Sequence, residues 1–274
     1  MELSSLPADI PSAQALVGAG AAWLAFVILL ALRVGATFML TPILHATSLP
    51  PSVRVALVAA LALAIASGAP APSQEWMGWP GFIVAAVMEL TLGATLGLGI
   101  LLAFASFSVA GQILDVQLGF GMAQIIDPVM QRPVPILTNA FERLGILVFF
   151  LVNGHHALLR GLHYSVERFP VGAGWSLMSS ADPVLKHVAS LFGLGFALAA
   201  PVAFCILLVE FVLGVIGRNL PQMNMFAMGI PVKILVGLTA LSLWFHGMGG
   251  AMSRVYASIT STWTAFFVAA AQGR

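Results

Sequence analysis

The stretch that decides the fold reads Gly111-Gln112-Ile113-Leu114-Asp115-Val116-Gln117-Leu118-Gly119-Phe120-Gly121-Met122-Ala123-Gln124-Ile125-Ile126-Asp127-Pro128. It contains two carboxylates, three glutamines and three glycines, and apolar runs of membrane-spanning quality stand on both sides of it. In a segment that faces lipid, such polar groups would lack hydrogen-bond partners at a large cost in free energy. We therefore expect the stretch to line a cavity, to pack against protein or to leave the bilayer, and this choice decides the function.

The overall composition is that of an integral membrane protein. Hydrophobic residues make up 60% of the chain and charged residues 8%, and the mean hydropathy is +1.01. These values exclude a large soluble core, and the long runs of Ala, Leu, Val and Gly predict an all-α, polytopic fold. The formal net charge of +1 offers no basic patch for nucleic acid.

The cysteine content and the N-terminus exclude two further features. Cys205 is the only cysteine, so the chain can form neither an internal disulfide nor a cysteine-based metal site. Residues Met1–Gln14 carry no Lys or Arg, which argues against a cleaved signal peptide. We therefore expect the first hydrophobic helix to be retained.

Six principal apolar runs and a shorter seventh follow one another along the chain. They are Leu16–Leu44, Val53–Ser67, Phe82–Leu114, Ile136–Asn153, Val188–Ile216, Ile230–Met252 and, as a final amphipathic or interfacial helix, Trp263–Ala271. A span takes about 20 residues, so the second run is short, whereas the third as one helix would reach about 50 Å. Such uneven lengths predict helical hairpins, kinked or broken helices, or helices partly outside the bilayer. If six spans alternate, the basic residues divide four against five between the two sides, which gives no orientation.

Charged residues interrupt several of these runs. They are Arg33, Glu89, Arg143 with its neighbour Glu142, and Glu210. Ionisable groups at membrane depth face the protein interior or water, so each is a functional candidate. The plainer interpretation is that they pair with partner helices and set the register of assembly. Glu89, Gly93 and Gly97 are spaced by four residues and predict a packing seam where another backbone approaches closely.

The sequence contains no pattern for metal or nucleophilic chemistry. His156, Arg160, His163 and Glu167 follow helical spacing, but the His-Glu-x-x-His ligand set of a zinc enzyme is absent. We interpret these residues as a solvated polar stripe on an interfacial helix. Neither Gly-x-Ser-x-Gly nor a phosphate-binding loop occurs, so we expect no enzyme activity, no cofactor and no metal.

A second polar interruption lies nearer the C-terminus. It reads Gly217-Arg218-Asn219-Leu220-Pro221-Gln222-Met223-Asn224-Met225-Phe226-Ala227-Met228-Gly229-Ile230-Pro231-Val232-Lys233. Pro221 and Pro231 are expected to prevent a continuous helix, and Asn219 and Asn224 offer caps. Its methionines provide an adaptable apolar surface. The segment is either a helix–loop–helix turn at the interface, or a flexible contact that seats against a partner or narrows a passage.

These two interruptions resemble segments of a known family. Residues 217–233 resemble the C-terminal signature of the FliR family of flagellar export-gate proteins, and residues 111–128 are similar to its Gly-Gln…Asp-Pro region. Further similar positions are Asn153-Gly154-His155, Phe169-Pro170-Val171-Gly172, Arg33 with Pro42, and Pro51 with Arg54. The resemblance runs from about Leu16 to Met252. Injectisome relatives share this architecture, while the methionine-rich stretch resembles the flagellar form.

The resemblance implies a non-enzymatic role in protein export. Family members are single subunits of a helical ring with several copies of two other gate proteins, FliP and FliQ, and FlhA-like and FlhB-like components are further expected partners. The implied location is the bacterial inner membrane, in the flagellar basal body, where the channel passes unfolded export substrates. The resemblance also implies that a loop, at about residues 106–124, plugs the closed channel.

Three sets of site candidates follow. The plug or pore-lining candidates are Phe107, Gly111, Gln112, Asp115, Gln117, Gly119, Phe120, Gly121 and Met122. The intramembrane charge candidates are Arg33, Glu89, Arg143 and Glu210. The assembly or loop candidates are Gly93, Gly97, Arg218, Pro221, Gln222, Asn224, Met225, Pro231 and Lys233.

The expected organisation is one membrane domain, residues 16–252, between an N-terminal tail (1–15) and an amphipathic C-terminal tail (253–274). Alternatives to a flagellar gate subunit are the equivalent injectisome subunit and, from another class, a small-solute secondary transporter, because broken helices also mark transporter sites. A transporter of this kind would predict an internal inverted repeat, which the sequence lacks. A membrane-embedded enzyme is disfavoured by the missing metal and nucleophile patterns.

Overall fold

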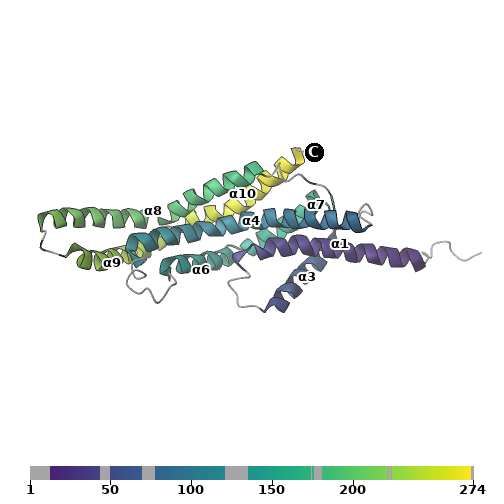
Figure 1. Cartoon of the computed structure of the whole chain (residues 1–274), viewed down its shortest axis with the longest axis horizontal. Helices are drawn as coiled ribbons and strands as arrows, with labels where there is room; N and C mark the ends of the chain where they lie inside the picture. The colour runs from purple at the N-terminus through teal and green to yellow at the C-terminus, as the bar shows by residue number, and fades with distance from the viewer. Residues whose placement is uncertain are drawn as a thin grey trace, which may run out of the picture. The chain divides into compact units, whose positions relative to one another are not determined.

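The computed structural model describes residues 13–43, 50–69, 78–120, 135–173, 175, 181–220, 222 and 224–272. All regular structure within these ranges is helical (Figure 1). The helices are α1 (Ala13–Met39), α3 (Pro51–Gly68), α4 (Trp79–Leu118), α6 (Ile136–Leu151), α7 (Gly154–Arg168), α8 (Ala181–Asn219), α9 (Met225–Phe245) and α10 (Gly249–Gln272). The predicted all-α fold is confirmed.

Five of these helices are long and apolar enough to cross a membrane: α1, α3, α4, α8 and α9. A sixth candidate is the pair α6 and α7, which meet at a bend of 72°. Asn153 turns the chain there with a φ of 56°, a left-handed conformation that asparagine tolerates better than most residues. The chain is therefore a polytopic membrane protein with five candidate spans, or six if the bent pair α6 and α7 forms one span.

The uneven helix lengths expected from the apolar runs are confirmed. Helix α3 has 18 residues, whereas α4 has 40 and α8 has 39. At a rise of 1.5 Å per residue, α4 and α8 are each about 60 Å long, roughly twice the hydrocarbon thickness of a bilayer. Both helices are therefore longer than a bilayer of ordinary thickness requires.

By their contacts, the described residues form two compact units. Unit 1 lies within Met1–Leu40, Ser48–Gly97 and Leu162–Trp175, and unit 2 lies within Thr41–Thr47, Leu98–Gly161 and Ser176–Arg274. In unit 1, α1 packs against α3 and against the first half of α4. In unit 2, α8 and α9 form an antiparallel hairpin, and α10 packs against α8 and α6 (Figure 1).

The predicted glycine seam lies between α4 and α1. A methyl group on Gly93 would overlap the carbonyl oxygen of Arg33, and one on Gly97 would lie 2.8 Å from the carbonyl oxygen of Thr37. The Thr37 hydroxyl also donates to the carbonyl oxygen of Gly93 at 3.0 Å. Only glycine allows the two backbones to approach this closely, so the seam prediction is confirmed.

Replacing Gly93 by alanine is expected to push α1 away from α4, because the new methyl group meets rigid backbone. Such overpacking typically destabilises by about 1–3 kcal/mol. The measurement is the fraction of monodisperse protein that survives heating in detergent. Gly193→Ala in α8 is the matched control, since a methyl group there has nothing within 4 Å. Equal thermal stability of the two variants would contradict the seam.

The core of unit 2 is an aromatic cluster that joins α4, α6 and α10. It consists of Phe104, Phe107, Phe149 and Tyr256, with neighbouring ring centroids 5.6–6.4 Å apart. The Tyr256 hydroxyl donates to the carbonyl oxygen of Gly145. Burial raises the pKa of Tyr256, in α10 outside the candidate spans, above its ordinary value, so this hydroxyl stays protonated and keeps its role as a donor.

Two expected boundaries near the C-terminus are wrong. The apolar run Ile230–Met252 is not one helix, because α9 ends at Phe245 and α10 begins at Gly249. The turn between them contains Gly247, and glycine is more costly to order in a helix than any other residue except proline. The last helix, expected over Trp263–Ala271, consequently starts at this turn and has 24 residues.

Candidate functional site

The first polar interruption is helical over more of its length than expected. Helix α4 continues to Leu118, and Gly119, with a φ of 81°, ends it in the left-handed region that favours glycine. The expected loop at residues 106–124 therefore differs from the structure as far as residue 118, where the chain still follows the helix. Gly121 and Met122 lie outside the described residues.

The other plug candidates divide by their position around α4. Phe107, Gly111 and Asp115, spaced by four residues, are buried on one face of the helix. Gln112 is exposed, and Gln117, Gly119 and Phe120 are half-buried. The buried set packs inside unit 2, so within this chain it contributes to the protein interior.

Asp115 caps the first turn of α6. Its two carboxylate oxygens accept hydrogen bonds from the backbone N–H groups of Leu137 and Thr138, both at 2.9 Å, and from the Thr138 hydroxyl at 2.7 Å. The residue before α6, Pro135, provides no side-chain cap of its own. Asp115 thus satisfies donors that a helix start otherwise leaves free, and its charge suits the positive end of the helix dipole.

Gly111 allows this contact by bringing the two helices together. A methyl group on Gly111 would lie 2.7 Å from the backbone nitrogen of Thr138. The close approach and the carboxylate cap therefore fix the end of α4 against the start of α6. The segment between α4 and α6 therefore starts and ends at two helix termini that contact each other.

Arg33 and Glu89 form a buried ion pair in unit 1. The guanidinium contacts the carboxylate with two bonds, 2.5 Å from Nε to Oε2 and 2.9 Å from Nη2 to Oε1, and the two side chains are 1% and 2% exposed. This bidentate arrangement is the strong form of an arginine–carboxylate pair. Both charges lie in candidate membrane spans, α1 and α4, and each neutralises the other.

The last turn of α7 and the chain that follows it complete this ion pair with backbone groups. Arg33 donates to the carbonyl oxygens of Ser165, at 3.0 Å, and Phe169, at 2.9 Å. Glu89 accepts from the backbone N–H of Gly172 at 3.0 Å. Gly172 has a φ of 80°, which glycine adopts without strain. The segment Phe169-Pro170-Val171-Gly172 is therefore shaped to hold the two charges.

Glu210 of α8 and Lys233 of α9 form a second ion pair within the hairpin of unit 2. The pair lines a cleft of about 400 Å³ whose other lining residues include Gly119, at the end of α4, and Gly214 and Gly229. Lys233 thus pairs with Glu210, one of the intramembrane charge candidates. The sequence pattern, which placed Lys233 among the assembly or loop candidates, did not predict this pairing.

The second polar interruption is shorter than expected. Helix α9 begins at Met225, and the Asn224 side chain caps it by accepting from the backbone N–H of Ala227 at 3.2 Å. Pro231 lies inside α9, so the expectation that it breaks the helix is wrong. It stands in the second turn, where it removes a single hydrogen bond. Arg218 and Gln222 are exposed at the hairpin turn, and Pro221 lies outside the described residues.

Arg143 and the polar stripe of α7 are on exposed surfaces. Arg143 of α6 is exposed, and its neighbour Glu142 accepts a hydrogen bond from the Ser108 hydroxyl at 2.6 Å. His156, Arg160, His163 and Glu167 form the predicted exposed stripe on α7, and His163 lies 3.4 Å from Glu167. In the part of the chain that the structure describes, no three His, Cys, Asp or Glu side chains come close enough to hold a metal ion.

Three contributing residues are absent from the sequence-based candidates. The Thr138 hydroxyl donates a hydrogen bond to Asp115, and the Ser165 hydroxyl accepts one from Arg33. The Tyr256 hydroxyl of α10 donates one to the carbonyl oxygen of Gly145 in α6. Each is a hydroxyl residue with other polar residues close by in the sequence, such as Asn139, His163 and Ser258. A hydroxyl in such a place is a weak signal, because in a helix it can equally bond to its own backbone.

Comparison of the sequence with known proteins places the chain in a family. Residues 24–259 match the family described as Bacterial export proteins, family 1. The flagellar biosynthetic protein FliR of Escherichia coli (strain K12) is 32% identical over 212 residues, covering 77% of this chain and 80% of the relative. The protein of the same name from Bacillus subtilis (strain 168) is 29% identical over 217 residues, with 78% and 83% covered.

A relative with a different name is also similar. The surface presentation of antigens protein SpaR of Shigella flexneri is 27% identical over 209 residues, covering 75% of this chain and 79% of the relative. The matched range, residues 24–259, covers the residues of the Arg33–Glu89 pair, of the Asp115 cap and of the hairpin formed by α8 and α9. The chain therefore belongs to the bacterial export proteins of family 1.

Proposed function

We propose that this chain is a core, non-enzymatic subunit of the flagellar type III protein export gate in the bacterial inner membrane. In this role it forms, with FliP-like and FliQ-like subunits, the channel for unfolded flagellar proteins, and it works with FlhA-like and FlhB-like components of the basal body. The observation that carries the proposal is the family match over residues 24–259 of a chain with five to six candidate spans. The proposal assigns no cofactor to the chain.

We further propose that the segment between α4 and α6 is the plug of the closed channel. The support is the connection of its two ends, because Asp115 and Gly111 fix the end of α4 against Leu137 and Thr138. Because these two helix ends are fixed to each other, they hold the proposed plug at one place in the channel. Since α4 is helical to Leu118, the proposed plug begins after this residue, later than residue 106.

Deleting residues 121–124 tests the plug. We expect the variant to assemble normally, because the cap and the glycine contact are preserved, and to raise ion leakage across the membrane. Leakage is measured as dissipation of the membrane potential in cells that express the complete gate. A deletion of equal length at residues 3–6 is the control. Leakage no higher than that of the control would contradict the plug.

The proposed domain organisation is a single membrane domain, residues 16–252, with short tails. The exposed residues Arg218 and Gln222 at the hairpin turn are proposed contacts with other gate subunits. A second candidate function is the equivalent subunit of an injectisome, since the chain is also 27% identical to a relative, SpaR, that has no flagellar name. Restoration of swimming in a strain that lacks its own FliR distinguishes the flagellar proposal from this second one.

A further inference from the structure

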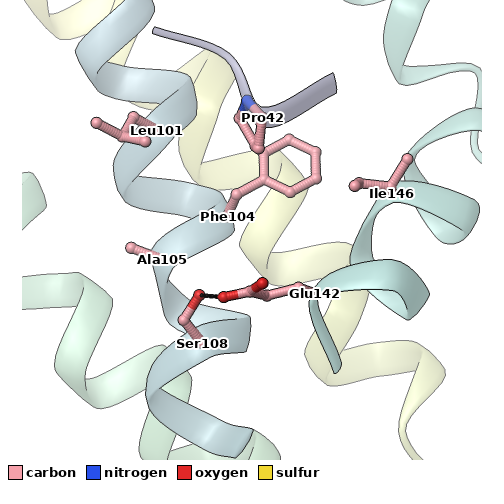
Figure 2. A pocket seen from close by; sticks show the side chains of 7 residues that line it. All are labelled: Pro42, Leu101, Phe104, Ala105, Ser108, Glu142 and Ile146. Atoms are coloured by element: carbon pink, nitrogen blue, oxygen red, sulfur yellow. Dashed lines mark hydrogen bonds between the residues drawn. The ribbon is translucent and has the colours of Figure 1, made fainter. Parts of the chain in front are cut away.

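A cleft in unit 2 contains a carboxylate, Glu142, for which the described part of the chain provides no ion pair. The cleft, of about 370 Å³, is lined by Pro42, Leu101, Phe104, Ala105, Ser108, Glu142 and Ile146. Figure 2 shows Glu142 hydrogen-bonded to Ser108, with Phe104, Pro42 and Ile146 around the same space. The lining is thus apolar except for this carboxylate and its hydroxyl partner.

The other acidic side chains that the structure describes each contact a basic side chain or accept several hydrogen bonds. Four of them contact a basic side chain: Glu89 with Arg33, Glu167 with His163, Asp182 with Lys186, and Glu210 with Lys233. Asp115 receives three hydrogen bonds at the start of α6. Glu142 receives a single hydrogen bond, from a hydroxyl, and it lies in α6, the first helix of the bent pair that is a candidate span.

Among the described residues no basic side chain pairs with Glu142, so its carboxylate is available to a partner from another subunit. Ionisable residues within membrane spans pair with one another or face protein or water, because hydrocarbon does not solvate them. An apolar cleft that ends in a carboxylate fits one kind of side chain, an aliphatic stem with a cationic head, as in lysine or arginine. Glu142 is exposed in this chain and therefore accessible to such a group.

We propose that the cleft at Glu142 is the docking site for a membrane-spanning helix of another subunit, and that this helix inserts a lysine or arginine to pair with Glu142. The inference rests on the proposed function, because it requires a hetero-oligomeric gate. It adds the chemistry of one subunit contact, which is an ion pair formed across an interface at membrane depth. Leu101, Phe104 and Ile146 pack against the stem of the inserted side chain.

Photo-crosslinking from the rim of the cleft identifies the occupant. A benzoylphenylalanine at Leu101 is irradiated in the complete gate in native membranes, and the crosslinked peptide is sequenced by mass spectrometry. We expect a peptide from an apolar helix of another subunit, with a Lys or Arg within about one helical turn of the crosslink. Crosslinks to lipid alone, to another part of this chain, or to a helix without a basic residue would each overturn the proposal.

Charge reversal then tests the ion pair. Glu142→Lys is expected to reduce co-purification of the crosslinked subunit by at least about tenfold, since it places like charges together at a desolvated contact. A second charge reversal, of the basic residue on the partner helix, is expected to restore co-purification. A Glu142→Lys variant that had only misfolded would not be rescued in this way. Glu167→Lys, on the exposed stripe of α7, is the matched control. Unchanged co-purification of Glu142→Lys would contradict the pair.

The two proposals fail in different ways. If the unaltered chain co-purifies with no export subunit, the proposed function is wrong. If the unaltered complex forms and Glu142→Lys retains the crosslinked subunit at the control level, only the docking site is wrong.

Discussion

Replacing Glu89 by alanine is expected to destabilise the protein by about 3–5 kcal/mol, the range measured when one member of a buried ion pair is removed. The Arg33 guanidinium, 1% exposed, keeps its charge but loses the carboxylate that neutralises it. Gly172 also loses the acceptor of its N–H group. We expect the variant to aggregate on extraction into detergent or to melt at a much lower temperature, measured by size-exclusion chromatography after heating.

Two controls separate the ion pair from a general effect of losing a carboxylate. Glu167→Ala removes an exposed partner of His163 and is expected to change the stability by less than about 0.5 kcal/mol. The double variant Arg33→Leu, Glu89→Leu removes both charges. It is expected to recover only part of the loss, because Ser165, Phe169 and Gly172 lose backbone hydrogen bonds. Full recovery would show that these backbone contacts contribute little.

Replacing Asp115 by alanine is expected to release the start of α6 from the end of α4. The change leaves the N–H groups of Leu137 and Thr138 without their acceptor, which typically costs about 1–3 kcal/mol for each buried donor. The local measurement is hydrogen exchange, and we expect faster exchange at these two amides while the Arg33–Glu89 region keeps its protection. Ion leakage is expected to rise as well, because the end of α4, where the proposed plug begins, is then no longer fixed to the start of α6.

Asp182→Ala is the matched control for Asp115. Asp182 also lies in the first turn of a helix, but its side chain is exposed and contacts only Lys186 at 2.6 Å. Its removal is expected to leave exchange at Leu137 and Thr138 unchanged. Equal protection of these amides in the Asp115→Ala variant and in the unaltered protein would contradict the capping role.

The sequence predicted those features that depend on local pattern. Apolar composition and run length gave the all-α membrane fold and the long α4, and the four-residue spacing of Glu89, Gly93 and Gly97 gave the seam with α1. These features can be predicted because helical periodicity places residues on one face without knowledge of the partner. The partner itself was not predicted, since Arg33 lies 56 residues from Glu89 in the chain.

The errors arose where polarity was interpreted as a break in the helix. The glutamines and Asp115 suggested a loop, but the helix continues because Asp115 is satisfied by α6, 22 residues further on. Pro231 suggested a second break, but the helix start at Met225 leaves it in an early turn where one lost hydrogen bond is tolerated. In both cases the missing information was tertiary. The position of Glu142 beside an apolar cleft was likewise not visible in the sequence.

The measurement that tests the central claim most directly is the composition and activity of the purified protein. The chain is extracted in mild detergent from native membranes, analysed by native mass spectrometry and reconstituted into vesicles. We predict that it is recovered as one copy in a hetero-oligomer with FliP-like and FliQ-like subunits, and that the chain alone transports nothing. A monodisperse single chain that carries a substrate across the vesicle membrane by itself would contradict the account.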